Sequence, residues 1–199
     1  MPPLKEASLD IIIFDLEFTA WEGSLARHWS GSDEHREIVE IGAVRIDPNN
    51  TAAGQQYFSR LVRPVINPDL SDYFIELTGI HQQKLDAEGV SLAQALAEFQ
   101  GFASGATPFY SYGNDGDVIK ENCTIAGLCT AVADFQFINA REAIKAAYDL
   151  CHSVTSSDLP KAVGLATAHR QHRAHRALDD AKAVASVLVP LLASGELKL

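Results

Sequence analysis

The 199-residue sequence has few cysteines, no long hydrophobic run and no apolar stretch among its first ten residues. Its three cysteines, Cys123, Cys129 and Cys151, match neither a disulfide framework nor a Cys-x-x-Cys metal site, so we interpret them as reduced packing residues. No apolar stretch approaches the roughly 20 residues of a membrane-spanning helix, which argues against a membrane protein. Residues 1–10 lack the apolar core of a secretory signal, and we therefore expect a cytoplasmic protein.

Net positive charge is also missing. The chain carries 16 Lys and Arg residues against 26 Asp and Glu residues, for a net charge of −10. This argues mildly against a broad basic surface for nucleic acid, but it does not exclude a nucleic-acid enzyme that works through metal ions, because bound cations would cancel part of the charge. The hydrophobic fraction of 47% is ordinary for a globular protein. The length predicts one domain over residues 1–199, with a core of about 9–192.

The clearest pattern that is present lies in Asp10–Phe18, where β-branched and aromatic residues predict a strand buried on both faces. Side chains alternate along a strand, so Asp15 and Glu17 share one face with Ile13. Two carboxylates in line at the end of a core strand repel each other and are costly to bury, which indicates a cation beside them. The alternative is that the strand simply runs out into solvent at Asp15.

The rest of the chain predicts strands first and then mostly helices, which favours an α/β layer domain with a mixed sheet. The polar stretch Thr19–Glu37 has no periodicity and is predicted to be a long loop, whose tryptophans either cover the core or stack on a base. The further strands are expected at Ile38–Ile46, Tyr57–Val62 and Phe109–Tyr112. The helices are expected at Ser71–Leu77, about Ser91–Ala103, about Asp115–Leu128, about Ala140–Cys151 and Leu159–Val163, with a last one after His175.

A pair of acids follows the strand at Phe109–Tyr112. On a helix that begins there, Asp115 shares a face with Ile119, whereas Asp117 shares a face with Lys120. Asp115 is therefore expected to point inward and Asp117 outward. Either aspartate could instead simply cap the helix, a role that its position suits.

A second pair of acids opens the last helix. Asp180 lies on an apolar stripe with Val184, whereas Asp179 lies with Lys182, so Asp180 is the inward acid. His175 precedes Asp180 by five residues, or about 140° around a helix, and is therefore expected in the preceding loop, free to approach a site that Asp180 helps to build. The basic residues around His175 suit a rim that faces phosphate, and they are His169, Arg170, His172, Arg173 and Arg176.

Taken in this order, the motifs resemble those of the DEDDh 3′–5′ exonucleases. Several blocks are similar to the Eri-type 3′ exoribonuclease branch, over about Leu9 to Leu192. The blocks are Phe14–Thr19 followed by Trp21–Gly23, Ile38–Gly42, Val62–Pro64 with Glu76–Ile80, and His175–Asp180. In the family an aromatic residue usually precedes the middle aspartate, whereas here Asn114 precedes Asp115, and Asp117 remains a rival.

The resemblance implies a ribonuclease H-like three-layer fold, with a mixed, mostly five-stranded central sheet flanked by helices. It implies a metal-dependent enzyme that releases nucleoside 5′-monophosphates from a single-stranded 3′ end, with RNA as the expected substrate. The alternatives are a DNA trimming or proofreading exonuclease and a non-catalytic regulatory module on the same fold. The implied residues are Asp15, Glu17, Asp115 and Asp180 as ligands of two Mg²⁺ or Mn²⁺ ions, His175 as general base, and Phe18, Thr19, Leu77 and Thr78 as a cradle for the terminal nucleoside.

Overall fold

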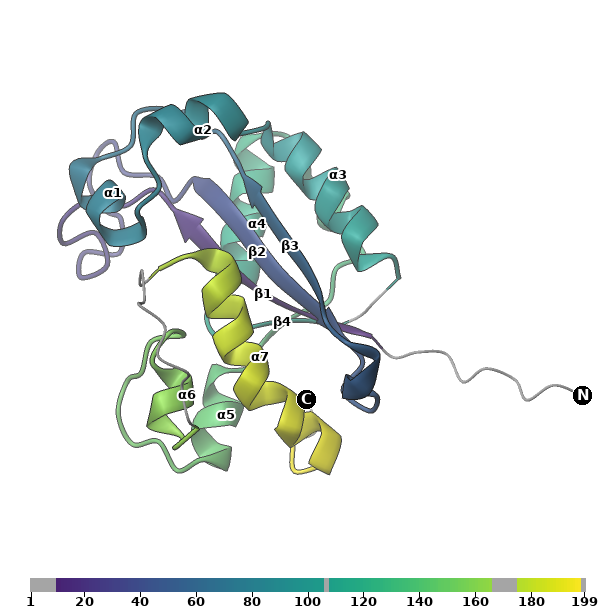
Figure 1. Ribbon diagram of the computed structural model, residues 1–199. Coiled ribbons are helices and arrows are strands. Elements are labelled where there is room, and N and C mark those ends of the chain that lie inside the picture. The colour runs from purple at the N-terminus through teal and green to yellow at the C-terminus, as the bar shows by residue number, and fades with distance from the viewer. Residues whose placement is uncertain (1–9, 106–107, 166–174, 198–199) are drawn as a thin grey trace, which may run out of the picture.

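The computed structural model describes residues 10–105, 108–165 and 175–197. A five-stranded sheet in the order β3-β2-β1-β4-β5 forms its centre (Figure 1). The strands are β1 (Ile11–Phe18), β2 (Ile38–Ile46), β3 (Gln56–Leu61), β4 (Phe109–Ser111) and β5 (Phe137–Asn139). The first three strands are antiparallel, whereas β4 runs parallel to β1 and to β5, so the predicted mixed sheet is confirmed.

Helices cover both faces of the sheet. They are α1 (Asp72–Thr78), α2 (Gln82–Glu88), α3 (Leu92–Ala103), α4 (Asp115–Ile125), α5 (Arg141–Ala147), α6 (Leu159–Ala162) and α7 (Ala177–Ser194). One apolar core joins the sheet to α3 and α4, and another joins it to α5, α6 and α7, which gives three layers (Figure 1). Within the described ranges, no helix combines the length and the apolarity needed to cross a bilayer.

The central strand β1 supplies both cores. Ile11 and Ile13 pack on the α7 side, whereas Ile12 and Phe14 pack on the α3 and α4 side, and all four are buried. Burial on both faces explains why the strand begins with three isoleucines in a row. Because the alternation continues along the strand, the next side chain on the α7 side is that of Asp15.

Two elements are not predicted by the sequence pattern. Helix α2 buries only Leu85, so it has no apolar stripe that would reveal a helix. Strand β5 is three residues long and is defined by its parallel pairing with β4. Two predicted helices also end early, at Ile125 rather than Leu128 and at Ala147 rather than Cys151.

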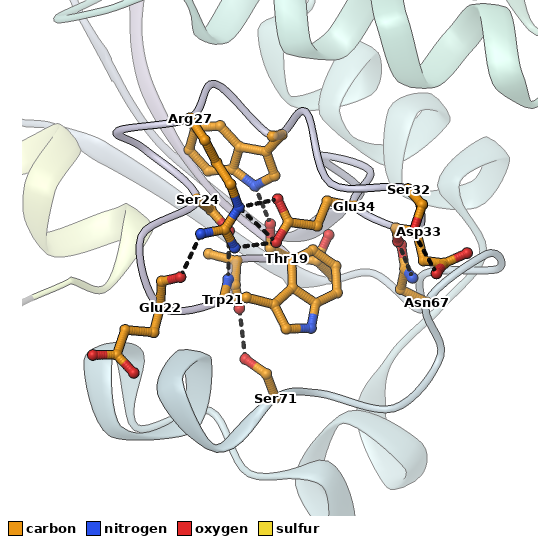
Figure 2. A network of polar contacts seen from close by, with 12 residues as sticks. Thr19, Trp21, Glu22, Ser24, Arg27, Ser32, Asp33, Glu34, Asn67 and Ser71 are labelled. Carbon is orange, nitrogen blue, oxygen red and sulfur yellow. Dashed lines mark hydrogen bonds and ion pairs between the residues drawn. The ribbon is translucent and has the colours of Figure 1, made fainter.

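The predicted loop Thr19–Glu37 is held in a fixed shape by its own polar contacts (Figure 2). The guanidinium of Arg27 binds the Glu34 carboxylate, and its Nη1 donates to the Glu22 carbonyl at 2.7 Å. The indole N–H of Trp29 donates to the carbonyl of Thr19 at 2.9 Å, and its ring packs edge-on against Phe18. Trp29 therefore covers the core, which was one of the two roles open to the tryptophans of this loop.

Candidate active site

Three carboxylates meet where β1 approaches the first turn of α7. Asp15 and Glu17 come from β1 and Asp180 comes from α7, and their side chains are only 7–8% exposed. One oxygen of each lies within 4.8 Å of the others. Alternation along the strand places the first two on one face, and the apolar stripe of α7 turns the third toward them. The geometry is thus a buried cluster of acids from two elements that are far apart in sequence.

The cluster is short of positive charge. Burial and the neighbouring acids raise the pKa of Asp15 and of Glu17 well above the ordinary value, and burial with nearby carboxylates raises the pKa of Asp180 to about 7. Arg176 opposes the rise in the pKa of Glu17 without cancelling it. A hydrogen bond from Ser156 Oγ to Asp15 Oδ1, at 3.2 Å, likewise opposes the rise in the pKa of Asp15 without cancelling it. Hard divalent cations prefer carboxylate oxygens, so this donor set fits Mg²⁺ or Mn²⁺.

Asp115, rather than Asp117, lies beside the cluster. It is the first residue of α4, is partly buried, and adds to the repulsion that raises the pKa of Asp15. Burial raises its own pKa to about 6, against the opposing effects of backbone N–H groups and of Arg141. Asp117 is exposed and pairs with Lys120 at 3.3 Å. The inward and outward directions expected from the helical pattern are therefore confirmed, although the 4.8 Å group itself consists of the other three acids.

His175 lies in the loop before α7, as its spacing predicts. Its backbone φ of +65° is in the left-handed region, which histidine enters more readily than most residues. Burial lowers the pKa of the imidazole, and the nearby carboxylate of Asp158 opposes this change. A partly buried imidazole that is neutral at neutral pH is suited to accept a proton.

The basic rim expected around His175 is only partly visible. Arg176 turns inward and pairs with Glu40 at 2.6 Å instead of facing outward. The remaining members of the segment, His169, Arg170, His172 and Arg173, lie outside the described residues.

The proposed nucleoside cradle consists of two pairs of side chains with different surroundings. The hydroxyl of Thr78 donates to the Phe74 carbonyl and accepts from the N–H of Ile80, and the hydroxyl of Thr19 is bonded within its own loop. Phe18 and Leu77 are partly exposed. Phe18 and Leu77 therefore keep some exposed apolar surface, although Phe18 also packs against Trp29, whereas the two threonines support the backbone.

Three residues near the site carry no motif that reveals them in the sequence. Ser156 and Asp158 come from the segment before α6 and reach Asp15 and His175 through the tertiary fold alone. Glu40 belongs to the block Ile38–Gly42, but an isolated glutamate in a strand shows nothing of its partner. Short polar residues in loops are too common for spacing to identify them.

We expect the metal-free protein to lose stability as the pH rises. Asp115 and Asp180 have pKa values of about 6 and about 7 in the folded chain, against 3.8 for an ordinary aspartate. A carboxyl group with a raised folded pKa contributes stability that is complete below its unfolded pKa and is lost as the pH rises through the folded value. The Tm in EDTA should therefore fall by roughly 5–10 °C between about pH 4 and pH 7. Saturating Mg²⁺ or Mn²⁺ should remove the fall, and a flat metal-free profile would contradict the preformed cluster.

Comparison with known proteins gives consistent matches. The sequence profile of the exonuclease family (RNase_T) matches residues 12–188. The chain is 37% identical over 89 residues to ERI1 exoribonuclease 2 of Xenopus laevis, an alignment that covers 45% of this chain and 12% of that protein. It is 27% identical over 207 residues to 3'-5' exoribonuclease 1 of Mus musculus, covering 96% of this chain and 57% of that protein. The chain thus spans less than two thirds of the length of both relatives.

Solved structures give the same result for the fold. The nuclease domain of 3'hExo, a DEDDh family member bound to rAMP, has a TM-score of 0.78 and 25% identity, over 98% of both chains. A complex of Escherichia coli exonuclease I with single-stranded DNA has a TM-score of 0.67 at 17% identity, over 92% of this chain and 40% of that one, and shows similarity of fold alone.

Proposed function

Because this chain belongs to the exonuclease family, in the Eri-type branch of its DEDDh members with their ribonuclease H-like fold, we propose that it is a metal-dependent 3′–5′ exonuclease acting on single-stranded RNA. Its products would be nucleoside 5′-monophosphates. The observation that carries the proposal is the buried group of Asp15, Glu17 and Asp180, whose oxygens lie within 4.8 Å of one another. Three buried acids with raised pKa values disfavour folding unless a cation compensates them.

Asp15, Glu17 and Asp180 would hold the divalent cations, with Asp115 at the edge of the cluster. Two bound cations would activate a water molecule, neutralise the phosphoryl oxygens and stabilise the leaving 3′ oxygen. The chain contributes the orientation of these acids. Ser156 contributes to it by donating a hydrogen bond to Asp15 Oδ1.

His175 would take the proton from the attacking water. A general base must be neutral before it accepts a proton, and burial lowers the pKa of this imidazole toward that state. The carboxylate of Asp158 favours the imidazolium that forms, because it raises the same pKa. His175 is only partly buried, so the proton can then pass to solvent.

The 3′-terminal nucleoside would lie between the segment after β1 and α1. The hydroxyl of Ser71, at the start of α1, donates to the carbonyl of Ala20, which ties the two segments together (Figure 2). Phe18 and Leu77 offer partly exposed apolar surface on these segments. RNA is proposed over DNA because the relatives that align over most of this chain include 3'-5' exoribonuclease 1.

The test is nucleotide release from a matched pair of 5′-labelled single strands, one with ribose and one with deoxyribose. With saturating Mg²⁺ we expect stepwise shortening from the 3′ end, free nucleoside 5′-monophosphates, and faster loss of the ribose strand. A circular single strand is the control, since it has no end and should stay intact. Faster loss of the deoxyribose strand would favour the DNA alternative. No release from either strand, with Mg²⁺ or Mn²⁺, would leave a binding module as the better description.

A further inference from the structure

Glu40 is a buried carboxylate that the proposed mechanism does not use. It is 0% exposed and lies on β2 directly opposite Glu17 of β1 in the antiparallel register. Directly opposite residues of neighbouring strands project on the same face, and like charges at such positions destabilise the sheet. A second buried acid beside the cluster therefore needs a positive partner of its own.

That partner is Arg176. Its Nε and Nη2 donate to the two oxygens of Glu40 at 2.9 and 2.6 Å, in a bidentate arrangement. Ser59 Oγ donates to the same carboxylate at 3.0 Å, and the N–H of Ala177 donates at 3.2 Å. The charge of Glu40 is thus balanced within the chain, unlike the charges of the acid cluster.

The pair holds the start of α7 against β2. Arg176 immediately precedes the helix, and its own side chain does not cap it. Glu40 supplies the acceptor for Ala177, whose N–H is one of the groups left without a partner at a helix start. Gly42 follows Glu40 by two residues on β2. A Cβ atom added to Gly42 would lie 2.0 Å from the backbone nitrogen of Leu178, which is too close for any side chain. The backbone of α7 therefore rests directly on the strand at this turn.

Two groups of the active site are attached to this turn. His175 is the residue before Arg176, and the N–H of Asp180 donates to the Arg176 carbonyl at 3.0 Å. On the premise of the exonuclease function, we propose that the Glu40–Arg176 ion pair is a positioning unit that sets the location of Asp180 and His175 relative to the acids of β1. In this role Glu40 is not a metal ligand, and Arg176 does not contact the phosphate of the substrate.

The test is a double-mutant cycle of Arg176→Lys and Glu40→Gln. Lysine keeps the charge but loses the guanidinium fork, and glutamine keeps the size of Glu40 but loses its charge. We expect each variant to lower kcat by about 10²-fold, the effect of a small displacement of catalytic groups. The KM of Arg176→Lys should equal that of Glu40→Gln, and the metal affinities of the two variants should also be equal. The double variant should be no slower than either single variant, because both substitutions break the same ion pair.

Arg45→Lys is the matched control. Arg45 lies on β2, the strand of Glu40, but toward its opposite end. It pairs with Asp10 at 2.7 Å, and its side chain is buried to a similar extent as that of Arg176. The kcat of Arg45→Lys should equal that of the wild type.

A kcat equal to that of the wild type in all variants would reduce the Glu40–Arg176 pair to a structural role and overturn the proposal. A KM increase confined to Arg176→Lys would make Arg176 a substrate contact, and loss of metal binding confined to Glu40→Gln would make Glu40 a ligand; either result would also overturn it.

Amide hydrogen exchange tests the same inference without activity. The N–H groups of Asp179 and Asp180 both donate to the Arg176 carbonyl, and they should exchange faster in Arg176→Lys but not in Arg45→Lys. Unchanged exchange would contradict the role of the pair in holding this turn. A wild type without nuclease activity would overturn the proposed function, whereas the exchange experiment would still decide the structural part of the inference.

Ser59→Ala is a milder variant, which removes the hydrogen bond from Ser59 to the Glu40 carboxylate. If the other variants do not fold, it should show a lower kcat and faster amide exchange in the same direction.

Discussion

We expect Asp180→Asn to abolish nucleotide release while Asp179→Asn leaves it nearly unchanged. Asp180 is 7% exposed and belongs to the cluster with Asp15 and Glu17, whereas the side chain of Asp179 is 53% exposed and pairs with Lys182 at 3.5 Å. Losing one ligand should lower kcat by roughly 10³-fold or more, because electrostatic stabilisation of the transition state is usually the largest contribution to catalysis. The measurement is kcat for both variants at saturating Mg²⁺.

Thermal melting gives the control for this comparison. Without metal and above pH 7, where the Asp180 carboxyl with its pKa of about 7 is mostly ionised, Asp180→Asn should melt at a higher temperature than the wild type, because a buried charge that its neighbours repel has been removed. With metal, the variant should gain less Tm than the wild type does. The substitutions Asp15→Asn and Glu17→Gln should behave in the same way. A folded Asp180→Asn variant with a normal rate would refute its assignment as a metal ligand.

His175→Ala should lower kcat by roughly 10²–10⁴-fold, the usual contribution of a positioned general base. The metal-induced rise in Tm should be the same as in the wild type, because His175 is not among the described residues grouped closely enough to hold a metal ion, which are Asp15, Glu17 and Asp180. His152→Ala is the matched control, since His152 is exposed and its Nδ1 lies 3.8 Å from the Sγ atom of its neighbour Cys151. Loss of the metal-induced rise would make His175 a ligand instead, and an unchanged rate would remove it from the mechanism.

The pH profile tests the same role independently. The base accepts a proton only when it is neutral, so kcat should rise with pH through the pKa of His175 and then level off. Burial lowers this pKa below 6.5, and the rise should therefore be complete by neutral pH. His175→Ala should lose this limb when metal is kept saturating at each pH. A limb that persists in the variant would belong to another group.

The direction of each acid could be predicted because a local period decides it. The 3.6-residue period of α4 places Asp115 inward and Asp117 outward, and the same reasoning separates Asp180 from Asp179 on α7. The two-residue period of β1 places Asp15 and Glu17 on one face. These predictions need only the residues within one element. The inward direction of Asp115 followed from this period even though the residue before it, Asn114, departs from the family pattern.

Other features could not be predicted because they depend on pairing between elements. Strand β5 is too short for any pattern and exists through its parallel partner β4. The bond from Ser156 to Asp15 joins residues 141 positions apart, and that from Arg176 to Glu40 joins residues 136 positions apart. Arg176 shows the consequence most directly, because its neighbours in sequence suggested a basic rim and the fold turned it inward.

The elements that carry the site, and the face of each element on which the acids lie, follow from hydrophobic periodicity, which is a property of the local chain. The meeting of Asp180 with Asp15 and Glu17, the neutralisation of Glu40 by Arg176, and the contact of α7 with β2 at Gly42 arise from packing between elements that are distant in sequence. Burying a charge is favourable only where a partner from another element compensates it. Arg176 meets that condition for Glu40 across 136 positions of the chain, and no spacing along the sequence encodes the pairing.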